Sequence, residues 1–347
     1  MDSSGTATDS FIHNLPKVEL HVHLEGSVQP ATLRELAARK GSLPSDVEQW
    51  ISTRQASGYR YATFMEFVEA FKFVATLLAT PQDYALAAIR LMEQLASQNV
   101  RYAEITLSAG VILWKKQPLD AIAEAVLEAT RASAGRLNLR ARWIFDAVRQ
   151  FGLDHALQVV DWAGRYRSHG VVAFGIGGDE ARGPAELFPA AFRRARDLGL
   201  HTLAHAGETA GPQSVRQAIE LLQAERIGHG LTAIQDPAVI ALLRERAIPV
   251  EVCLTSNVAT GLLKRIEDHP LPRLLQENLL VSLHSDDPAL FGTCLEDEFA
   301  RATRAFSLSA PQLVSLCRNA AHASFLPSEE RESLAAEIDA VSSAMLA

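Results

Sequence analysis

The sequence is poor in cysteine, and the few cysteines form no pattern. Cys253, Cys294 and Cys317 are odd in number, widely separated and never arranged as Cys-x-x-Cys. This argues against a disulfide scaffold and indicates reduced thiols in a cytoplasmic setting. We expect the three side chains to act as small buried residues without a chemical role.

Long basic runs and long apolar runs are absent as well. The 33 basic and 41 acidic residues give a formal charge of −8, and no basic cluster marks a nucleic-acid footprint. No apolar stretch is long enough to span a bilayer. Residues 1–10 lack the charged and apolar regions of a targeting segment and are interpreted as a short disordered leader. We therefore expect neither a nucleic-acid nor a membrane partner.

The sequence does contain ample core-forming material, since 48% of its 347 residues are hydrophobic. Apolar segments alternate with helix-like stretches, a pattern typical of a parallel α/β sheet. The expected strands are 17–23, 100–108, 140–148, 171–178, 201–208, 225–231, 248–256 and 280–288. The expected helices include 118–135, 154–169, 186–198, 214–223 and 237–246. We expect a single domain over 1–347, because α/β barrels routinely exceed the usual domain length.

Polar clusters stand at the ends of four of these strands. His21 and His23 end the first strand, and residues two apart on a strand project from the same face. The other clusters are His205 with Glu208, His229 alone, and Asp286 with Asp287. The first and eighth strands are neighbours only in a closed barrel, where all carboxyl ends open onto one mouth. We therefore predict a (β/α)8 TIM-type barrel with a site at that mouth.

The segment between the first two strands is unusually long, and we expect residues 30–99 to form a helical insertion. Placed beside the tip of the first strand, it could act as a lid that excludes water from an aromatic substrate. Its apolar stripe could equally pack onto the barrel. The stripe at helical spacing is Phe64, Phe67, Val68 and Phe71, with Met65 and Phe73 adding apolar bulk.

Three imidazoles and one carboxylate form a ligand set that suits Zn²⁺. We expect one ion per chain, and such an ion yields hydroxide from water near neutral pH, which predicts hydrolysis. The predicted ligands are His21, His23, His205 and Asp286.

The remaining polar residues at the strand ends are given other roles. His229 is interpreted as a non-ligand that takes the proton of water or orients the resulting hydroxide, and a fourth His ligand is the rival interpretation. Glu208, buried among apolar residues, is expected to act as an acid. Asp287 is expected to bind a substrate N–H, or simply to shape the turn before Pro288.

Taken together, these motifs resemble the adenosine deaminase family, a branch of the metal-dependent amidohydrolases. The resemblance implies a (β/α)8 barrel, one zinc ion, and hydroxide attack at C6 of a 6-aminopurine nucleoside that releases ammonia. It implies proton donation from Glu208 to purine N1, contacts of Asp287 near N7 and of the Gly178 N–H near N3, and a place for His23 at the substrate. The motifs span 18–26, 178–180, 205–208, 228–230 and 285–288.

The resemblance leaves the substrate open between several nucleosides. Glu25 stands where many adenosine-specific members carry the Asp that meets the ribose 5′-hydroxyl, and the glycine-rich segment 175–178 offers extra room. We expect adenosine or deoxyadenosine. The alternative is aminodeoxyfutalosine, an adenosine with a bulky 5′ aryl acid used in menaquinone synthesis. Adenine ranks lower, because adenine deaminases tend to replace Gly-Asp-Glu with a Ser-Glu pair. His284, where Asn is common, has no role in this scheme.

Other function classes fit less well. A binuclear hydrolase would need a lysine at the end of the fourth strand, and 171–180 contains none. The Pro-Cys-x-x-Cys signature of polynucleotide and cytidine deaminases is missing. A non-catalytic purine-binding protein would be favoured by loss of Glu208 or His229, and both are present. No feature of the sequence indicates an oligomeric state.

Overall fold

An eight-stranded parallel sheet forms the centre of the computed structural model, which describes residues 8–40 and 44–346. The strands follow one another around the sheet in chain order. They are β1 (Lys17–His23), β2 (Val100–Leu107), β3 (Arg140–Val148), β4 (Val171–Gly177), β5 (His201–Ala206), β6 (Arg226–His229), β7 (Val250–Val252) and β8 (Val281–Leu283).

The sheet nearly closes on itself just beyond the end of β8. The backbone N–H of His23 donates to the carbonyl of Asp286 at 2.8 Å, and the N–H of Asp286 donates to the carbonyl of His21 at 2.9 Å. These two bonds join the eighth segment to the first, so the predicted (β/α)8 barrel is confirmed.

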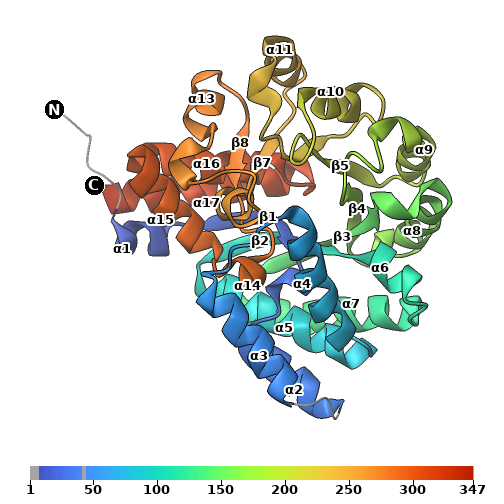
Figure 1. The fold of residues 1–347 in the computed structure, drawn as a ribbon. Coiled ribbons are helices and arrows are strands. Elements are labelled where there is room, and N and C mark those ends of the chain that lie inside the picture. The colour runs from blue at the N-terminus through green and yellow to red at the C-terminus, as the bar shows by residue number, and fades with distance from the viewer. Residues whose placement is uncertain (1–7, 41–43, 347) are drawn as a thin grey trace.

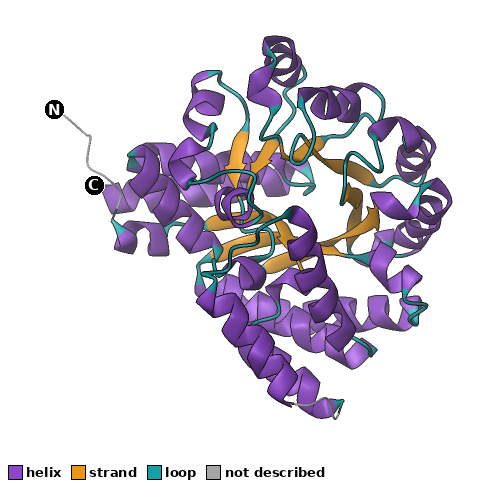
Figure 2. Ribbon diagram, in the orientation of Figure 1, coloured by secondary structure: helices purple, strands orange, loops and turns teal. Residues whose placement is uncertain are grey.

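Helices surround the strands on the outside (Figure 2). Figure 1 shows their order by colour along the chain. Within the described residues no helix combines the length and the apolar character needed to cross a membrane. The helices are α1 (Asp9–Asn14), α2 (Pro30–Arg39), α3 (Pro44–Ala56), α4 (Phe64–Leu77), α5 (Pro81–Ser97), α6 (Ala109–Trp114), α7 (Leu119–Leu137), α8 (Leu153–Arg165), α9 (Pro189–Asp197), α10 (Pro212–Glu220), α11 (Pro237–Glu245), α12 (Leu254–Ala259), α13 (Leu271–Gln276), α14 (Pro288–Phe291), α15 (Leu295–Phe306), α16 (Ala310–Ala323) and α17 (Ser328–Leu346).

Several strands are buried along their whole length because they are covered on both faces. Every residue of β1 is buried, and all of β4 except Val172 is buried. Helices cover the outer face and side chains fill the interior, as in parallel sheets generally. The run Val171–Gly177 therefore shows no polar alternation, which is why it reads as a continuous apolar segment.

Charged residues share the barrel interior with a small apolar cluster of Ile144, Ala173 and Leu203. Arg226 makes ion pairs of 2.6 Å with both Glu104 and Glu251, and all three side chains are fully buried. Buried charges persist only when they are paired in this way. The network links Glu104 through Arg226 and Glu251 to His21, one of the residues of the predicted site.

Several predicted boundaries are wrong at the carboxyl ends of the later strands. The predicted strand 248–256 is β7 followed by α12, and the predicted strand 280–288 is β8 followed by a loop that leads into α14. The predicted strands are too long because the residues that follow each strand are buried too, and periodicity alone cannot separate short buried strands from buried helical turns.

The N-terminal prediction is partly wrong and partly outside the described residues. Residues 1–7 are not described, whereas Asp9 and Ser10 belong to α1 rather than to a leader. The Thr8 hydroxyl accepts a hydrogen bond from the N–H of Phe11 and caps that helix. Burial of Phe11 and Ile12 then holds the helix against the core.

The segment between β1 and β2 is helical, as expected, and consists of four helices from α2 to α5. Helix α5 packs against α7 and against β2, the position of an ordinary barrel helix. Helix α4 instead contacts the short helix η1 (Glu25–Ser27) that follows β1 at the barrel mouth. Helices α2 to α4 are therefore the part that departs from the regular barrel.

Candidate active site

The predicted ligands converge at the carboxyl ends of the strands. His21 and His23 project from the same face of β1, and Nε2 of each lies 3.4 Å from Oδ1 of Asp286. Nε2 of His205, from β5, lies 3.3 Å from Nε2 of His23. All four side chains are buried. The structure thus brings together residues separated by up to 265 positions in the chain.

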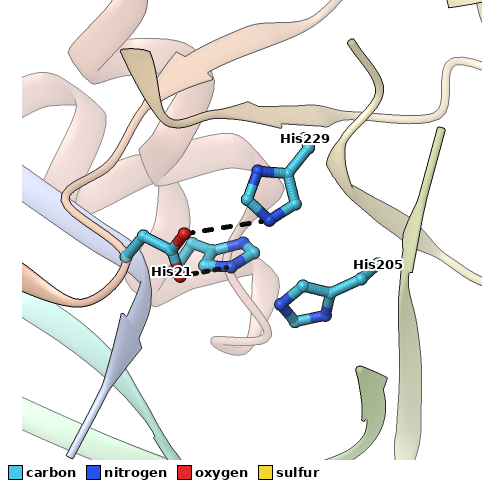
Figure 3. A group of neighbouring side chains, drawn as sticks. His21, His205 and His229 are labelled. Carbon is cyan, nitrogen blue, oxygen red and sulfur yellow. Dashed lines mark ion pairs between the residues drawn. The ribbon is translucent and has the colours of Figure 1, made fainter. Parts of the chain in front are cut away.

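His229 belongs to the same cluster. Figure 3 shows the rings of His21, His205 and His229 turned toward one another, with ion pairs that join one carboxylate to His21 and to His229. That carboxylate is Asp286, whose Oδ2 lies 3.9 Å from Nε2 of His229. Ligand atoms of these four residues lie within 4.8 Å of one another, while His23 groups with Asp286 and Asp287. The geometry therefore accommodates both the non-ligand and the fourth-ligand interpretations of His229.

Two members of the cluster have unusual backbone conformations. His229 has φ of +63° and Asp286 has φ of +62°, in the left-handed region that residues other than glycine seldom occupy. Such conformations cost free energy and cluster at functional sites. They turn these side chains inward from the strand ends.

The donor set fits a metal ion. Nδ1 of His21 is engaged by Glu251 at 2.8 Å and Nδ1 of His205 by the Ile176 carbonyl at 3.2 Å. Their Nε2 atoms are thereby directed into the cluster, and Nε2 of His21 is buried without a hydrogen-bond partner in the described residues. Outer carboxylates and carbonyls orient metal-binding imidazoles in this way. Imidazoles with one carboxylate suit zinc.

Glu208 stands beside this cluster in a loop held by Glu180. Oε1 of Glu208 lies 3.7 Å from Nε2 of His229. The Glu180 carboxylate accepts the N–H groups of Gly207 and Glu208 at 2.8 and 2.9 Å. Burial, followed by the nearby carboxylates Asp286 and Glu180, raises the pKa of Glu208 well above its ordinary value. The raised pKa favours the protonated, neutral form of this side chain.

Asp287 presents an unpaired oxygen next to the cluster. Its Oδ1 is buried without a partner in the described residues, and burial together with Asp286 raises the pKa of the Asp287 carboxyl. Gly26 lies directly against it, since a Cβ at that position would stand 1.7 Å from Oδ1. Close packing against Gly26 thus helps to position Asp287.

A cavity of about 390 Å³ opens onto these side chains. Its inner end is polar, and its outer end is largely apolar. The lining residues of α4 are Phe64, Met65, Phe67, Val68, Phe71 and Lys72. Those at the inner end include His23, His205, Glu208, His229, Asp286 and Asp287.

The aromatic stripe of α4 both packs against neighbouring elements and lines the cavity. Phe67 packs against Phe291 with ring centroids 5.0 Å apart, and it also lines the cavity. Phe73, by contrast, turns away and stacks on Trp50 at 4.9 Å. Whether the segment moves as a lid stays a prediction.

Comparison with known proteins identifies the chain. The adenosine deaminase family model matches residues 16–341. The chain belongs to this family. The resemblance read from the motifs is thereby confirmed, and the protein is a hydrolase that acts on amidine C–N bonds of purines.

Relatives in this family have different substrates. The aminodeoxyfutalosine deaminase of Streptomyces avermitilis is 38% identical over 99% of this chain and 96% of its own. The crystal structure of an adenine deaminase from Arthrobacter aurescens is similar with a TM-score of 0.87 and 29% identity, covering 94% of this chain and 98% of its own. An amidohydrolase from Burkholderia ambifaria with bound zinc has a TM-score of 0.87 and 26% identity, covering 100% of this chain and 95% of its own.

Glu25, compared above with the aspartate of other family members, lies in η1 at the edge of the cavity. One carboxylate oxygen accepts the N–H of Ser108 at 3.1 Å, and the other is buried without a partner in the described residues. Burial raises the pKa of Glu25 to about 7. Ser108 lines the cavity, so the Glu25 carboxyl lies next to the space expected for the substrate.

The glycine-rich segment 175–178 meets the cavity at Gly177 and Gly178. At Gly175 a Cβ would contact Ile144 at 3.3 Å, and at Gly177 it would contact Asp146 at 3.1 Å. These glycines let neighbouring side chains approach the strand. Gly178, with φ of +98°, lines the cavity where a side chain would meet Gln150.

Sequence reasoning missed several residues that shape the site. Asp146, at the end of β3, is buried and lines the cavity. Like the predicted site residues, Asp146 is a polar residue that follows an apolar segment near the carboxyl end of a strand. It could have been found by that criterion. Asn257 gave no such signal, because its contact of 3.3 Å with Nδ1 of His229 depends on the fold of α12. His284 proves to be structural, since its Nδ1 pairs with buried Glu19 at 3.0 Å.

Proposed function

We propose that this protein catalyses zinc-dependent hydrolytic deamination at C6 of a 6-aminopurine nucleoside, yielding the 6-oxopurine and ammonia. The observation that carries the proposal is the convergence of His21, His205 and Asp286 beside a Glu208 whose pKa is raised. Hydrolysis needs an activated water and an acid that protonates the ring, and this arrangement offers candidates for both.

The metal site would be formed by His21, His23, His205 and Asp286, one ion per chain. When bound, zinc supplies a positive charge that makes water nucleophilic near neutral pH and stabilises negative charge that develops on oxygen. Glu251 and the Ile176 carbonyl hold two of the imidazoles in position for this role.

The acid and the base are assigned to two neighbouring side chains. Glu208, protonated, donates its proton to purine N1, which makes C6 more electrophilic. His229 takes the proton of the attacking water, and its Nε2 lies 3.7 Å from Glu208 Oε1, so both groups face the same reacting centre. Water adds at C6, the C6–N bond breaks, and the amino group leaves as ammonia with the protons supplied by these residues.

The purine would be oriented by groups around the cavity. Asp287, whose Oδ1 is unpaired, binds the N7 side, and the backbone N–H of Gly178 binds the N3 side. His23 borders the ring as well as serving as a ligand. A dry, close-fitting cavity strengthens each of these polar contacts.

Among the candidate substrates, aminodeoxyfutalosine is favoured over adenosine and adenine. The aminodeoxyfutalosine deaminase relative matches nearly the whole chain at 38% identity, which supports this alternative better than our first expectation of adenosine. Glu25 and the largely apolar outer cavity also suit a substrate with a large 5′ group. The three free cysteines, two of them buried, favour a cytoplasmic location.

The test combines metal analysis with a substrate panel. We expect one zinc per chain and deamination, followed by ultraviolet absorbance, with kcat/KM decreasing from aminodeoxyfutalosine to adenosine to adenine. Preference for adenine would contradict the substrate assignment. Tight binding of nucleosides without turnover by the zinc-loaded protein would instead identify a non-catalytic purine-binding protein.

A further inference from the structure

The outer part of the cavity carries two exposed apolar side chains that the proposed chemistry does not use. Trp114, at the end of α6, is 61% exposed, the highest value among the large hydrophobic residues exposed in the described part of the chain. Met65, on α4, is 42% exposed. Both line the same cavity. Large apolar side chains left exposed at a cavity mouth mark binding surfaces.

Trp114 and Phe151 together form one wall of the cavity. The Trp114 ring lies parallel to that of Phe151, with centroids 5.8 Å apart and an angle of 9° between the planes. Phe151 belongs to the short helix η2 (Arg149–Phe151) that follows β3, and its ring also lines the cavity. Two parallel, stacked rings at a cavity wall favour a flat apolar group that can extend the stack or pack against their edges.

A cation stands in the lining near this wall. Arg182 lies in the loop after β4, and Nη1 of Arg149 donates to the carbonyl of Gly183 at 2.7 Å, which fastens that loop beside η2. The Arg182 guanidinium makes no hydrogen bond within residues 8–40 and 44–346, and its side chain is 70% exposed. The nearest carboxylate, Asp179, is 3.7 Å away.

The carboxylate of Asp179 accepts hydrogen bonds from the backbone of its own loop. Its Oδ1 accepts the N–H groups of Ala181 and Arg182 at 3.0 and 3.2 Å. The other cation of the lining, Lys72, is engaged by Glu69 at 2.6 Å. Arg182 is therefore the cation whose donors are available to a ligand, and its planar fork matches a carboxylate.

We propose that Trp114, Phe151 and Arg182 form an outer subsite for an aromatic carboxylate joined to the nucleoside. This rests on the proposed function, because it extends the substrate outward from the purine site. The rings bind the aromatic group and Arg182 pairs with its carboxylate. The inner site then selects the purine and the outer subsite selects the group attached to it.

The kinetic test compares three substrates in the zinc-loaded enzyme: adenosine, its 5′-(carboxyphenyl)thio derivative and the uncharged carbamoyl counterpart. In the Arg182→Gln variant we expect the preference for the carboxylate over the carbamoyl compound to fall about fivefold or more. In Trp114→Ala the preference for either aryl compound over adenosine should fall about tenfold. Arg131→Gln and Leu346→Ala, at exposed residues outside the cavity lining, should leave both preferences unchanged.

Binding of the corresponding 6-oxo products, measured by calorimetry, gives a result that does not need turnover. The carboxyphenyl product should bind the wild type more tightly than Arg182→Gln, with no such difference for the carbamoyl product. Equal affinities, or equal losses for all three substrates, would overturn the subsite. Failure of the wild type to deaminate even adenosine would instead count against the proposed function, and the calorimetry would still decide the subsite.

Discussion

Glu251 Oε2 lies 2.8 Å from Nδ1 of His21, and the two side chains are at most 2% exposed. The same carboxylate pairs through Oε1 with Arg226 at 2.6 Å. One buried glutamate thus connects the proposed zinc site with the charged interior of the barrel. It fixes the orientation of an imidazole whose other nitrogen, Nε2, lies 3.4 Å from Asp286 Oδ1.

We therefore predict that Glu251→Gln lowers zinc affinity. An amide orients His21 less strongly than a carboxylate, and loss of such an outer partner costs about 10- to 100-fold in metal affinity. Competition with a chelator measures the change. Glu267→Gln, an exposed carboxylate in η6 (Ile266–Asp268), is the matched control. Unchanged zinc affinity in Glu251→Gln would refute the orienting role.

Replacement of the proposed acid should affect turnover and spare the metal. We expect Glu208→Gln to lower kcat by about 100- to 10,000-fold, the usual contribution of general acid catalysis, with zinc content unchanged because Glu208 is not a proposed ligand. In the wild type, activity should decline as pH rises through the raised pKa of Glu208, since only the protonated form donates. A variant with normal turnover would remove Glu208 from the mechanism.

The contact between Gly26 and Asp287 can be tested with a single methyl group. In Gly26→Ala the new Cβ would stand 1.7 Å from Asp287 Oδ1 and 2.4 Å from its Cβ, so the aspartate must move. We expect kcat/KM to fall by at least about tenfold, the loss of one buried hydrogen bond to substrate. Gly135→Ala in α7, where a Cβ meets no atom within 4 Å, is the control and should retain activity. Wild-type kinetics in Gly26→Ala would argue against a substrate role for Asp287.

Buried His269 should make stability depend on pH. Burial lowers the pKa of His269 from 6.5 to about 3, and its Nδ1 accepts the N–H of Leu271 at 3.0 Å, which requires the neutral ring. Below pH 6.5 the His269 ring becomes protonated in the unfolded chain but stays neutral in the folded chain. The contribution of the neutral, buried His269 to the free energy of unfolding is therefore lost as pH falls.

The comparison with a variant isolates that contribution. Between pH 6.5 and pH 5 the free energy of unfolding of the wild type should fall by about 2 kcal/mol more than that of His269→Gln. Denaturant titrations at the two pH values measure the difference. Parallel losses in the two proteins would show that His269 is readily protonated in the folded state.

Much of the fold could be predicted from the local pattern of apolar and polar residues along the chain. The predicted strands 17–23 and 140–148 agree with β1 and β3 at both ends. In β1, Val18, Leu20 and Val22 alternate with polar residues, which is the period of a strand. The predicted strands 248–256 and 280–288 are too long. There the chain passes from a short strand into residues that are buried without belonging to a strand.

The site shows the same division. His21, His23, His205 and Asp286 were predicted together because each closes an apolar segment and a closed barrel brings strand ends to one mouth. Glu251 was not, since it lies inside a three-residue strand, and only the pairing with His21 and Arg226 gives it a function. Arg182 was also missed, because an exposed arginine in a loop has no distinguishing pattern.

The sequence by itself determined the barrel, the family and the residues able to bind a metal, because periodicity and motif order are properties of the chain. The tertiary structure alone decided which oxygens and nitrogens lack partners, how Gly26 presses on Asp287, and that Trp114 shares a cavity with Glu208. Such relationships depend on distances between segments far apart in the chain. Those distances are set by packing, which no local pattern records.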